Sequence, residues 1–221
     1  MVGTRAQAST NPARRRRSDG ELTRRRVLDA AVESILELGY YQTSSNEIAR
    51  RAGVTWGTLQ HQFGTREMLL LEVLNDAFDD LEEAVSTADV SGSTLEQRLQ
   101  RVLRVLAEHY GKPPHLAHLQ ILLDLTQNPS TSEETRAAVL GHGRQLSRAW
   151  RPLFEQALGD AAHDNDLVTF AFSTIRGYLL GDLVASRITR GRQSAVQRDL
   201  LVRGVAAAVR DEAESRGFRV E

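Results

Sequence analysis

The sequence predicts an all-α protein in which a three-helix N-terminal head is joined by a long fourth helix to a larger helical body. Three observations support this prediction. Apolar residues recur at helical spacing in every segment that can be read, glycine and hydroxyl residues separate these segments, and no segment alternates apolar and polar residues as a strand does. The chain has 221 residues, of which 41% are hydrophobic, so it is long enough to bury a substantial core.

The head is predicted from helix start and stop signals in residues 21 to 66. The apolar stripe of the first helix ends before Gly39, which is placed as a C-terminal cap. Ser44, with Glu47 three residues later, predicts a capping box at the start of a second helix. The predicted helices run from Glu21 to Gly39, from Ser44 to Gly53, and from Thr55 to Phe63. Short helices joined by tight glycine turns are typical of a helix-turn-helix domain.

The body is predicted to be helical throughout residues 67 to 221. Its first helix is the long connector, in which Leu74, Phe78 and Leu81 share an apolar face. The predicted helices are a fourth from Thr65 to about Val85, a fifth capped by Ser93 with Glu96, a sixth from His115 to about Thr126, a seventh from about Ser130 through Trp150 to Phe154, and a final pair over about residues 164–187 and 194–216.

Positive charge is concentrated at the start of the chain. Residues 1 to 66 hold eleven Arg and six acidic residues, whereas the remainder holds seventeen basic and twenty-three acidic residues. A basic segment on an acidic body is expected of a nucleic-acid-binding domain, and uneven solvation is the alternative. Residues 1 to 20 are predicted to be a disordered basic arm that contacts phosphates or the minor groove, or else a solvated tail; its basic run is Arg14, Arg15, Arg16 and Arg17.

The stretch "GVTWGTLQHQF", residues 53 to 63, is unusual for a helix in a soluble protein. Leu59 and Phe63 are placed to pack inward, which leaves the hydrogen-bonding side chains of this helix facing outward. Gln can pair with adenine, Thr can contact a thymine methyl group or a phosphate, and Gly57 allows close approach of the backbone. The segment is therefore predicted to be a recognition helix, although Trp56 could instead pack on the neighbouring helix.

At these residues a family resemblance becomes specific. The segment "TSSNEIARRAGVTWGTLQHQFGTREMLLLEVL" resembles the DNA-binding region of TetR-family transcriptional regulators, and the resemblance extends over about residues 22 to 75. The matching positions are Ile48, Ala49, Ala52, Gly53, Val54, Thr55, Gly57, Thr58, Leu59, Phe63, Arg66 and Glu67. Trp56, Gln60 and Gln62 depart from the family pattern, which implies an altered operator preference.

The arm, the recognition helix and the resemblance together give the predicted DNA contacts. The candidates are Arg14, Arg15, Arg16, Arg17, Thr23, Thr43, Ser44, Thr55, Trp56, Gly57, Thr58, Gln60, His61, Gln62 and Arg66. Thr23, Thr43, Ser44 and Arg66 are expected to contact the DNA backbone, and the polar residues of the third helix are expected to reach base edges.

The last two predicted helices are apolar on more than one side. Phe170 and Tyr178 lie on one face of the first of them, and Ile175 and Leu179 lie on another, so this helix needs two partners. The resemblance implies that the pair forms a homodimer bundle, and an intramolecular helix pair is the alternative. The candidate interface residues, all small, are Gly177, Gly181, Gly204 and Ala208.

The resemblance also implies a small-molecule pocket in the body. The candidate effector-binding residues are Phe78, His109, His115, His118, Gln120, Trp150, Phe154, Phe170 and Arg176. The apolar inner face of the fourth helix favours a small, largely apolar effector. His115 and His118 share a helical face and could bind a transition metal, but polar cavity lining is the preferred interpretation, so neither a metal nor a cofactor is predicted.

The sequence contains neither a phosphate-binding glycine loop nor a nucleophile elbow, and this argues against an enzyme. The predicted function is that of a dimeric transcriptional regulator, a repressor released from palindromic double-stranded operator DNA by an effector. The alternatives are an all-helical enzyme or metal-binding module with an unused head, and a constitutive DNA-binding protein. No cysteine is present, and no apolar signal segment or membrane span is recognised, so a cytoplasmic location is expected.

Overall fold

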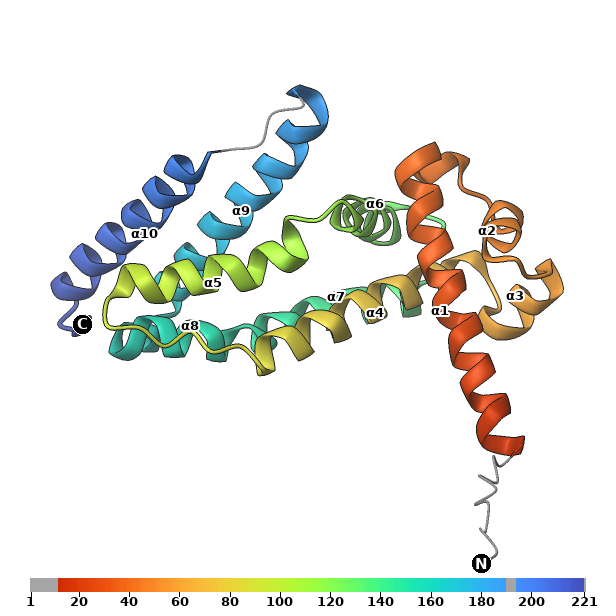
Figure 1. The fold of residues 1–221 in the computed structure, drawn as a ribbon, viewed down its shortest axis with the longest axis horizontal. Coiled ribbons are helices and arrows are strands. Elements are labelled where there is room, and N and C mark those ends of the chain that lie inside the picture. Colours follow the sequence, from red (N-terminus) through yellow and green to blue (C-terminus); the bar gives the residue numbers. More distant parts are fainter. Residues whose placement is uncertain (1–11, 190–193, 221) are drawn as a thin grey trace, which may run out of the picture. The chain divides into compact units, whose positions relative to one another are not determined.

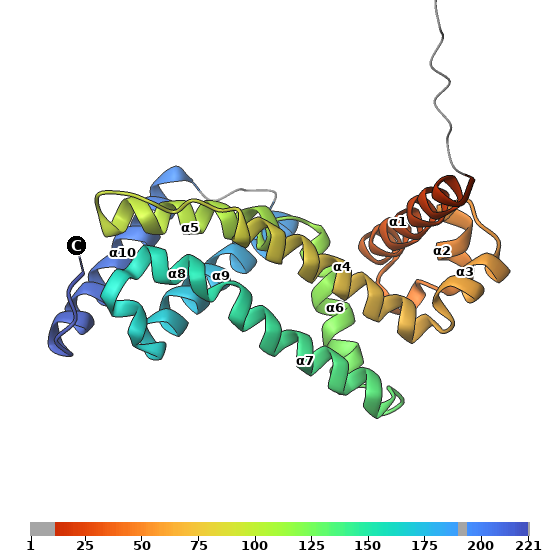
Figure 2. The same cartoon turned by 90° about the horizontal axis from the view of Figure 1, so that it is seen from below.

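The computed structural model describes the backbone of residues 12–189 and 194–220, and the side chains of these residues apart from 12–18, 145–147 and 189. Every regular element in these ranges is helical, which confirms the predicted all-α class. The chain divides after Val73 into two compact units, and both are drawn in Figure 1 and, turned by 90°, in Figure 2. This division lies inside the fourth helix, later than the boundary that the sequence predicted at residue 66.

The first unit is built from four elements and the start of a fifth. These are α1 (Pro12–Leu38), the 3-10 turn η1 (Tyr40–Gln42), α2 (Ser45–Ala52), α3 (Trp56–Phe63) and the first turns of α4 (Arg66–Ser86). α1 packs against α2, and α2 packs against α3. The core between them contains the predicted apolar positions Leu28, Ala31, Ile35, Ile48, Ala49, Leu59 and Phe63.

α1 begins earlier than the sequence analysis predicted. It starts at Pro12 rather than Glu21, so the part of the predicted disordered arm from residue 12 onward is helical, and residues 1–11 lie outside the described ranges. Proline suits the first turn of a helix, because its fixed φ is helical and the amide hydrogen that it lacks has no partner there. Ala13 and the arginines that follow it are strong helix formers. The helix propensity of these residues outweighs the destabilising effect of the single Gly20 inside the helix.

The turns of the head follow the predicted signals. Gly53 has φ of 64°, a left-handed conformation that ends α2, and its amide hydrogen bonds to the Ala49 carbonyl. Ser44 caps α2 by accepting a hydrogen bond from the Glu47 amide at 3.2 Å. The Glu47 carboxylate, however, accepts from Arg50 and Arg51 instead of completing the predicted capping box.

The second unit is a bundle around α5. Its helices after α4 are α5 (Leu95–Tyr110), α6 (Pro114–Gln127), α7 (Glu133–Ala149), α8 (Arg151–Leu158), η2 (Gly159–His163), α9 (Asn165–Thr189) and α10 (Ala195–Ser215). α5 packs against α8, α9 and α10, and these helices bury a core that includes Leu99, Leu106, Phe154 and Ile175. The predicted bounds of α6, α9 and α10 agree with these to within two residues.

Two predicted features of the body are wrong in detail. α5 is capped by Thr94, whose hydroxyl accepts from the Gln97 amide, and not by Ser93. The predicted seventh helix, from about Ser130 to Phe154, is two helices, because α7 ends at Ala149 and α8 begins at Arg151. Pro152 lacks an amide hydrogen and its ring clashes with the preceding helical turn, which explains the break.

α9 is the one helix in the described ranges that is long and apolar enough to cross a membrane. Its buried residues Ala171, Ile175 and Leu179 belong to the core of the second unit. Packing within this unit therefore accounts for one apolar face of α9.

Candidate functional site

The surface of α3 carries the polar residues that the sequence analysis assigned to DNA contact. Leu59 and Phe63 are 2% and 8% exposed, and they fix α3 to the core of the head. Trp56 is 51% exposed, so about half of its surface is accessible to solvent and it is not part of the core of the head. The other exposed residues of this surface are Thr55, Gly57, Thr58, Gln60 and His61.

Local hydrogen bonds fix the first turn of α3. The Thr55 hydroxyl accepts from the Thr58 amide at 3.1 Å and lies 2.9 Å from the Thr58 hydroxyl. A Cβ atom placed on Gly57 would meet only the Thr55 hydroxyl oxygen, at 3.8 Å, so the packing of the head does not require glycine here. The absence of a side chain at Gly57 leaves the backbone of the first turn open to a ligand.

Three predicted contact residues form internal contacts of the head instead. Thr43 is 2% exposed, and its hydroxyl donates to the Gly39 carbonyl at 3.0 Å. The Arg66 guanidinium donates to the Tyr40 carbonyl at 3.1 Å and lies over the Tyr40 ring. The Gln62 amide donates to the Gly20 carbonyl at 3.2 Å and so connects α3 to α1. Each polar group satisfies a backbone carbonyl of the head, and the burial of Thr43 corrects the prediction that its side chain faces DNA.

The remaining candidates of the head have mixed positions. Ser44 is exposed at the start of α2 while it caps that helix. The Thr23 hydroxyl donates to the Asp19 carbonyl one turn earlier in α1. α1 includes Arg14, Arg15, Arg16 and Arg17, but the structure does not describe their side chains.

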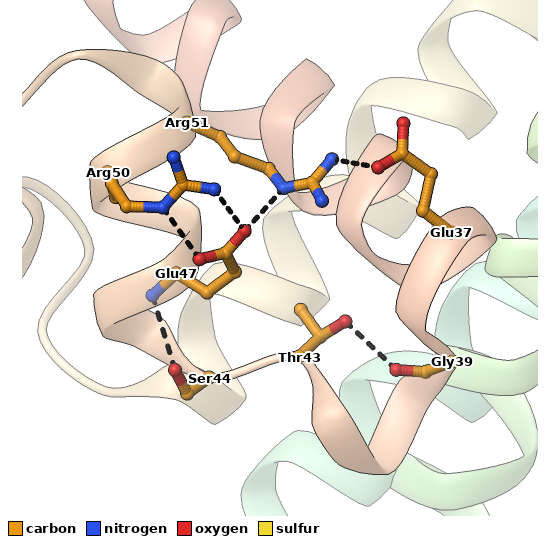
Figure 3. A network of polar contacts seen from close by, with 7 residues as sticks. All are labelled: Glu37, Gly39, Thr43, Ser44, Glu47, Arg50 and Arg51. Atoms are coloured by element: carbon orange, nitrogen blue, oxygen red, sulfur yellow. Dashed lines mark hydrogen bonds and ion pairs between the residues drawn. The ribbon is translucent and has the colours of Figure 1, made fainter.

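A charged network that the sequence analysis did not identify holds α2 against α1 (Figure 3). The Glu47 carboxylate accepts from Arg50 and from Arg51, and Arg51 also pairs with Glu37 of α1 at 2.6 Å. Hydrogen bonds from Arg50 and Arg51 lower the pKa of Glu47 to about 2. The spacing of Glu47 and Arg51, four residues apart in a helix, was the available sequence signal. The network fixes the helix that precedes α3.

The second unit contains a cavity of about 180 Å³. Six of the nine predicted effector-binding residues line it: Phe78, His109, His115, His118, Trp150 and Arg176. Tyr110 and Phe172 also line it and were not among the predicted residues. Phe172 lies parallel to Trp150 with the ring centroids 4.0 Å apart, so the two rings stack face to face and together form one aromatic wall of the cavity.

The other three predicted residues lie away from this cavity. Phe154 is fully buried behind the wall, with its ring edge-on to Trp150. Gln120 is exposed, and Phe170 is 44% exposed. Phe170 and Phe172 are two residues apart on α9 and therefore point in different directions, and the cavity is lined by Phe172 and not by the predicted Phe170.

Three histidines meet at one side of the cavity. The ring of His109 lies 5.8 Å from that of His115 and 6.4 Å from that of His118. Burial lowers the pKa of His109 to about 4, that of His115 to about 3 and that of His118 to about 4. The three rings are therefore neutral at pH 7. Within the described residues, no group of three or more His, Cys, Asp or Glu side chains has an arrangement that could hold a metal ion.

Several buried polar atoms of the cavity residues have no hydrogen-bond partner. They are the Tyr110 hydroxyl, both ring nitrogens of His115, Nδ1 of His118 and Nε of Arg176. Buried polar groups in proteins are nearly always paired, and unpaired ones concentrated in a cavity indicate a site for a polar group of a ligand or for water. The cavity thus combines an apolar wall with a set of unused hydrogen-bonding groups.

The outer face of α9 and α10 is apolar and exposed. Gly177, Gly181, Gly204 and Ala208 are all exposed, and a Cβ atom on any of the three glycines would meet no atom within 4 Å. Large apolar side chains are exposed on the same two helices: Phe170, Val184, Ile188, Val196 and Leu200. α9 and α10 pack against each other within the chain, but Gly177, Gly181, Gly204 and Ala208 lie on their exposed sides.

Comparisons with known proteins agree with the geometry of the head. The family described as "Bacterial regulatory proteins, tetR family" matches residues 27–73. The HTH-type transcriptional regulator BetI of Escherichia coli is 38% identical over 85 residues, which is 37% of this chain and 43% of that protein. The chain spans less than two thirds of the length of the curated relatives that it matches.

Solved structures share the fold over most of the chain. A transcriptional regulator from Rhodococcus sp. Rha1 superposes with a TM-score of 0.64 at 16% identity, covering 86% of this chain and 96% of that one. The multidrug binding protein EbrR, solved as a complex with ethidium, superposes with a TM-score of 0.54 at 18% identity, covering 85% of this chain and 98% of that one. At these identities the likeness establishes the all-α fold.

Proposed function

The chain belongs to the TetR family of bacterial regulatory proteins through its head, and from this premise we propose that it is a dimeric, sequence-specific DNA-binding repressor that a small molecule releases from its operator. The observation that carries the proposal is the exposed surface of α3, where Thr55, Trp56 and Gln60 project from a helix that packs on the core of the head. The N-terminal residues of a recognition helix in this position contact base edges in the major groove. Binding to chromosomal DNA implies a cytoplasmic location.

Selection of bound duplexes from a random pool tests the DNA-binding function directly. The full-length protein is expected to enrich a two-fold symmetric site with half-sites about one helical turn, ~34 Å, apart, because two recognition helices must enter successive major grooves. Enrichment of an asymmetric site would argue against a dimer, and a pool that shows no enrichment would contradict sequence-specific binding. The selected duplex then serves as the operator in the experiments below.

Replacing Gln60 with alanine is expected to change which sequence is preferred. Gln60 is exposed on α3, and a bidentate contact between an amide and a base provides about 1 to 3 kcal/mol of discrimination. The measurement is a repeated selection together with operator titration at fixed salt. Gln42, which is exposed in η1, provides the matched control, since Gln42→Ala should leave the preferred site unchanged. If Gln60→Ala selects the original site with unchanged affinity, Gln60 does not read bases.

Dimerisation is proposed to occur through the outer face of α9 and α10. The exposed apolar side chains and the open glycines of this face support a partner that approaches closely, and a second copy satisfies the two-fold symmetry of an operator. The last two helices carry most of the exposed large apolar residues of the second unit.

The cavity of the second unit is proposed to hold the effector. Leu74 and Phe78 of α4 line it, and α4 is continuous from Arg66, directly after the recognition helix, to Ser86. A ligand that favours one position of α4 would bias the position of the head, by its difference in affinity for the two states. The neighbour EbrR is described as a multidrug binding protein, which supports a ligand site in this fold.

Effector and operator are expected to weaken each other's binding. A coupling of about 1 to 3 kcal/mol would change operator affinity by roughly 5- to 150-fold, and linkage requires the same factor for effector affinity in the presence of operator. The measurement is a thermal-shift screen of small molecules, followed by titration of each stabilising compound with and without labelled operator. If compounds that bind the cavity leave operator affinity unchanged, the protein is a constitutive DNA-binding protein.

A further inference from the structure

Arg176 brings a positive charge to the wall of an otherwise apolar and neutral cavity. Its guanidinium lies 5.2 Å from the centre of the Tyr110 ring and 6.0 Å from that of Phe172, and its Nε is buried without a hydrogen-bond partner. The residues that line the cavity include no Asp or Glu. The aromatic faces attract the cation, but they do not replace a counter-ion.

The neighbouring side chains can donate hydrogen bonds but cannot neutralise Arg176. The Tyr110 hydroxyl is buried and unpaired, and His115 is 5% exposed with both ring nitrogens unpaired. The charge of Asp80 acts on His118, and no acidic residue is among those that line the cavity. Arg176 is only partly exposed and its buried Nε has no hydrogen-bond partner, so this arrangement is best satisfied by an anion that enters with a ligand.

The shape of the cavity limits the rest of the ligand. Its volume of about 180 Å³ is slightly larger than the ~150 Å³ of an engineered apolar cavity that binds benzene. The stacked rings of Trp150 and Phe172 form its aromatic wall, and Leu74, Leu119 and Leu122 add apolar surface. A single aromatic ring with one short substituent fits these dimensions and this surface.

We infer that the cavity binds a small aromatic monocarboxylate, with its ring along Trp150 and Phe172 and its carboxylate on Arg176, where the Tyr110 hydroxyl and His115 add hydrogen bonds. The inference names the class of effector, and to that extent it rests on the proposed function. Arg176 is the specificity-determining residue, because its guanidinium can pair with both oxygens of a carboxylate. A neutral ligand of the same shape can accept a hydrogen bond from the guanidinium but cannot neutralise its charge, and a cationic ligand is repelled by it.

The experiment compares three ligands of one shape and three charges on the full-length protein. Benzoate, benzamide and benzylamine are titrated by calorimetry at pH 7. Benzoate is expected to bind about 10- to 100-fold more tightly than benzamide, as charge-assisted hydrogen bonds require, and benzylammonium should show no binding. Equal affinity for benzoate and benzamide, or preference for the cation, overturns the inference. This comparison needs no variant, so it does not depend on how a substituted protein folds.

A substitution then assigns the preference to Arg176. Arg176→Met keeps an unbranched apolar side chain and removes the charged guanidinium, so benzoate affinity should fall about 10- to 100-fold, to near that of benzamide, whose own affinity should change much less. Arg187→Met, at an exposed position of the same helix, is the control and should bind both ligands as the unmodified protein does. Benzoate affinity unchanged in Arg176→Met would contradict the assignment.

The outcomes separate this inference from the proposed function. If neutral aromatic compounds release the operator while benzoate has no advantage over benzamide, the inference is wrong and the repressor function stands. If benzoate binds through Arg176 but leaves operator affinity unchanged, the ligand class is correct and the proposed coupling is wrong.

Discussion

Replacing Gly177 with glutamate is expected to convert the protein into monomers and to reduce operator affinity by at least about 100-fold. Gly177 lies on the outer face of α9, and a Cβ atom there would meet nothing within 4 Å of the same chain. A glutamate at this position therefore fits the isolated protomer. In a close two-fold contact it would place a carboxylate in an apolar interface without a partner, which strongly opposes association.

The large expected loss of affinity follows from bivalent binding. When two heads are linked, the second head binds its half-site at a high effective concentration, and this raises overall affinity by roughly 10²- to 10⁴-fold over one head. A monomer loses this factor even though its recognition helix is intact. Binding to a single half-site should consequently be similar for Gly177→Glu and the unmodified protein when both are measured per head.

Sedimentation or light scattering provides the mass, and titration with the selected duplex provides the affinity. The matched control is Gly141→Glu in α7, another helical glycine at which a Cβ atom would meet nothing within 4 Å. It should remain dimeric and bind the operator normally. A Gly177→Glu protein that is still a dimer, with full operator affinity, would move the proposed interface away from α9.

The sequence predicted the head well because its signals are local. Ser44, Thr55, Gly39 and Gly53 act within one turn of the chain, and each stands at the helix end that its residue type indicated. The break between α7 and α8 could have been predicted from Pro152 by the same kind of local signal, because proline disrupts the helical turn that precedes it. The start of α1 was less predictable, since polar and basic residues are compatible both with a helix and with a solvated arm.

Side-chain partners that are distant in sequence were not predictable in the same way. Gln62 and Arg66 have the residue types of DNA contacts, yet they bond to carbonyls of the head that lie 42 and 26 residues away in the sequence. Folding brings these partners together, and the periodicity of the sequence does not predict them. Likewise, Tyr110 and Phe172 look like ordinary core positions in the sequence, and only the folded bundle places them beside Arg176.

The body is expected to lose stability as the pH falls from about 6.5 to about 4, through its three buried histidines. The ordinary pKa of histidine is 6.5, and burial lowers it to about 4 in His109, about 3 in His115 and about 4 in His118. Arg176 adds to this effect on His109 and His115, and Lys112 adds to it on His109, whereas Asp80 opposes it on His118. The dominant cause in all three is removal of the ring from water.

The direction of the effect follows from proton uptake. Below pH 6.5 the unfolded chain protonates these rings while the folded chain does not, so the unfolded state binds more protons and the free energy of unfolding decreases with falling pH. The decrease stops near pH 3 to 4, where the folded rings also protonate. Lowering a histidine pKa from 6.5 to about 4 corresponds to roughly 3 kcal/mol, and lowering it to about 3 corresponds to roughly 5 kcal/mol, against a total stability of about 5 to 15 kcal/mol.

Urea unfolding of the full-length protein, followed by helical circular dichroism between pH 7.5 and pH 4, measures this dependence. His115→Asn removes one titrating ring and should make the slope of the unfolding free energy against pH shallower below pH 6.5. His163→Asn is the matched control, because His163 is exposed in η2 of the same unit, and its slope should equal that of the unmodified protein. An unchanged slope for His115→Asn, or a body that gains stability as the pH falls to 4, would mean that the His115 ring is protonated in the folded state and that water reaches the cavity.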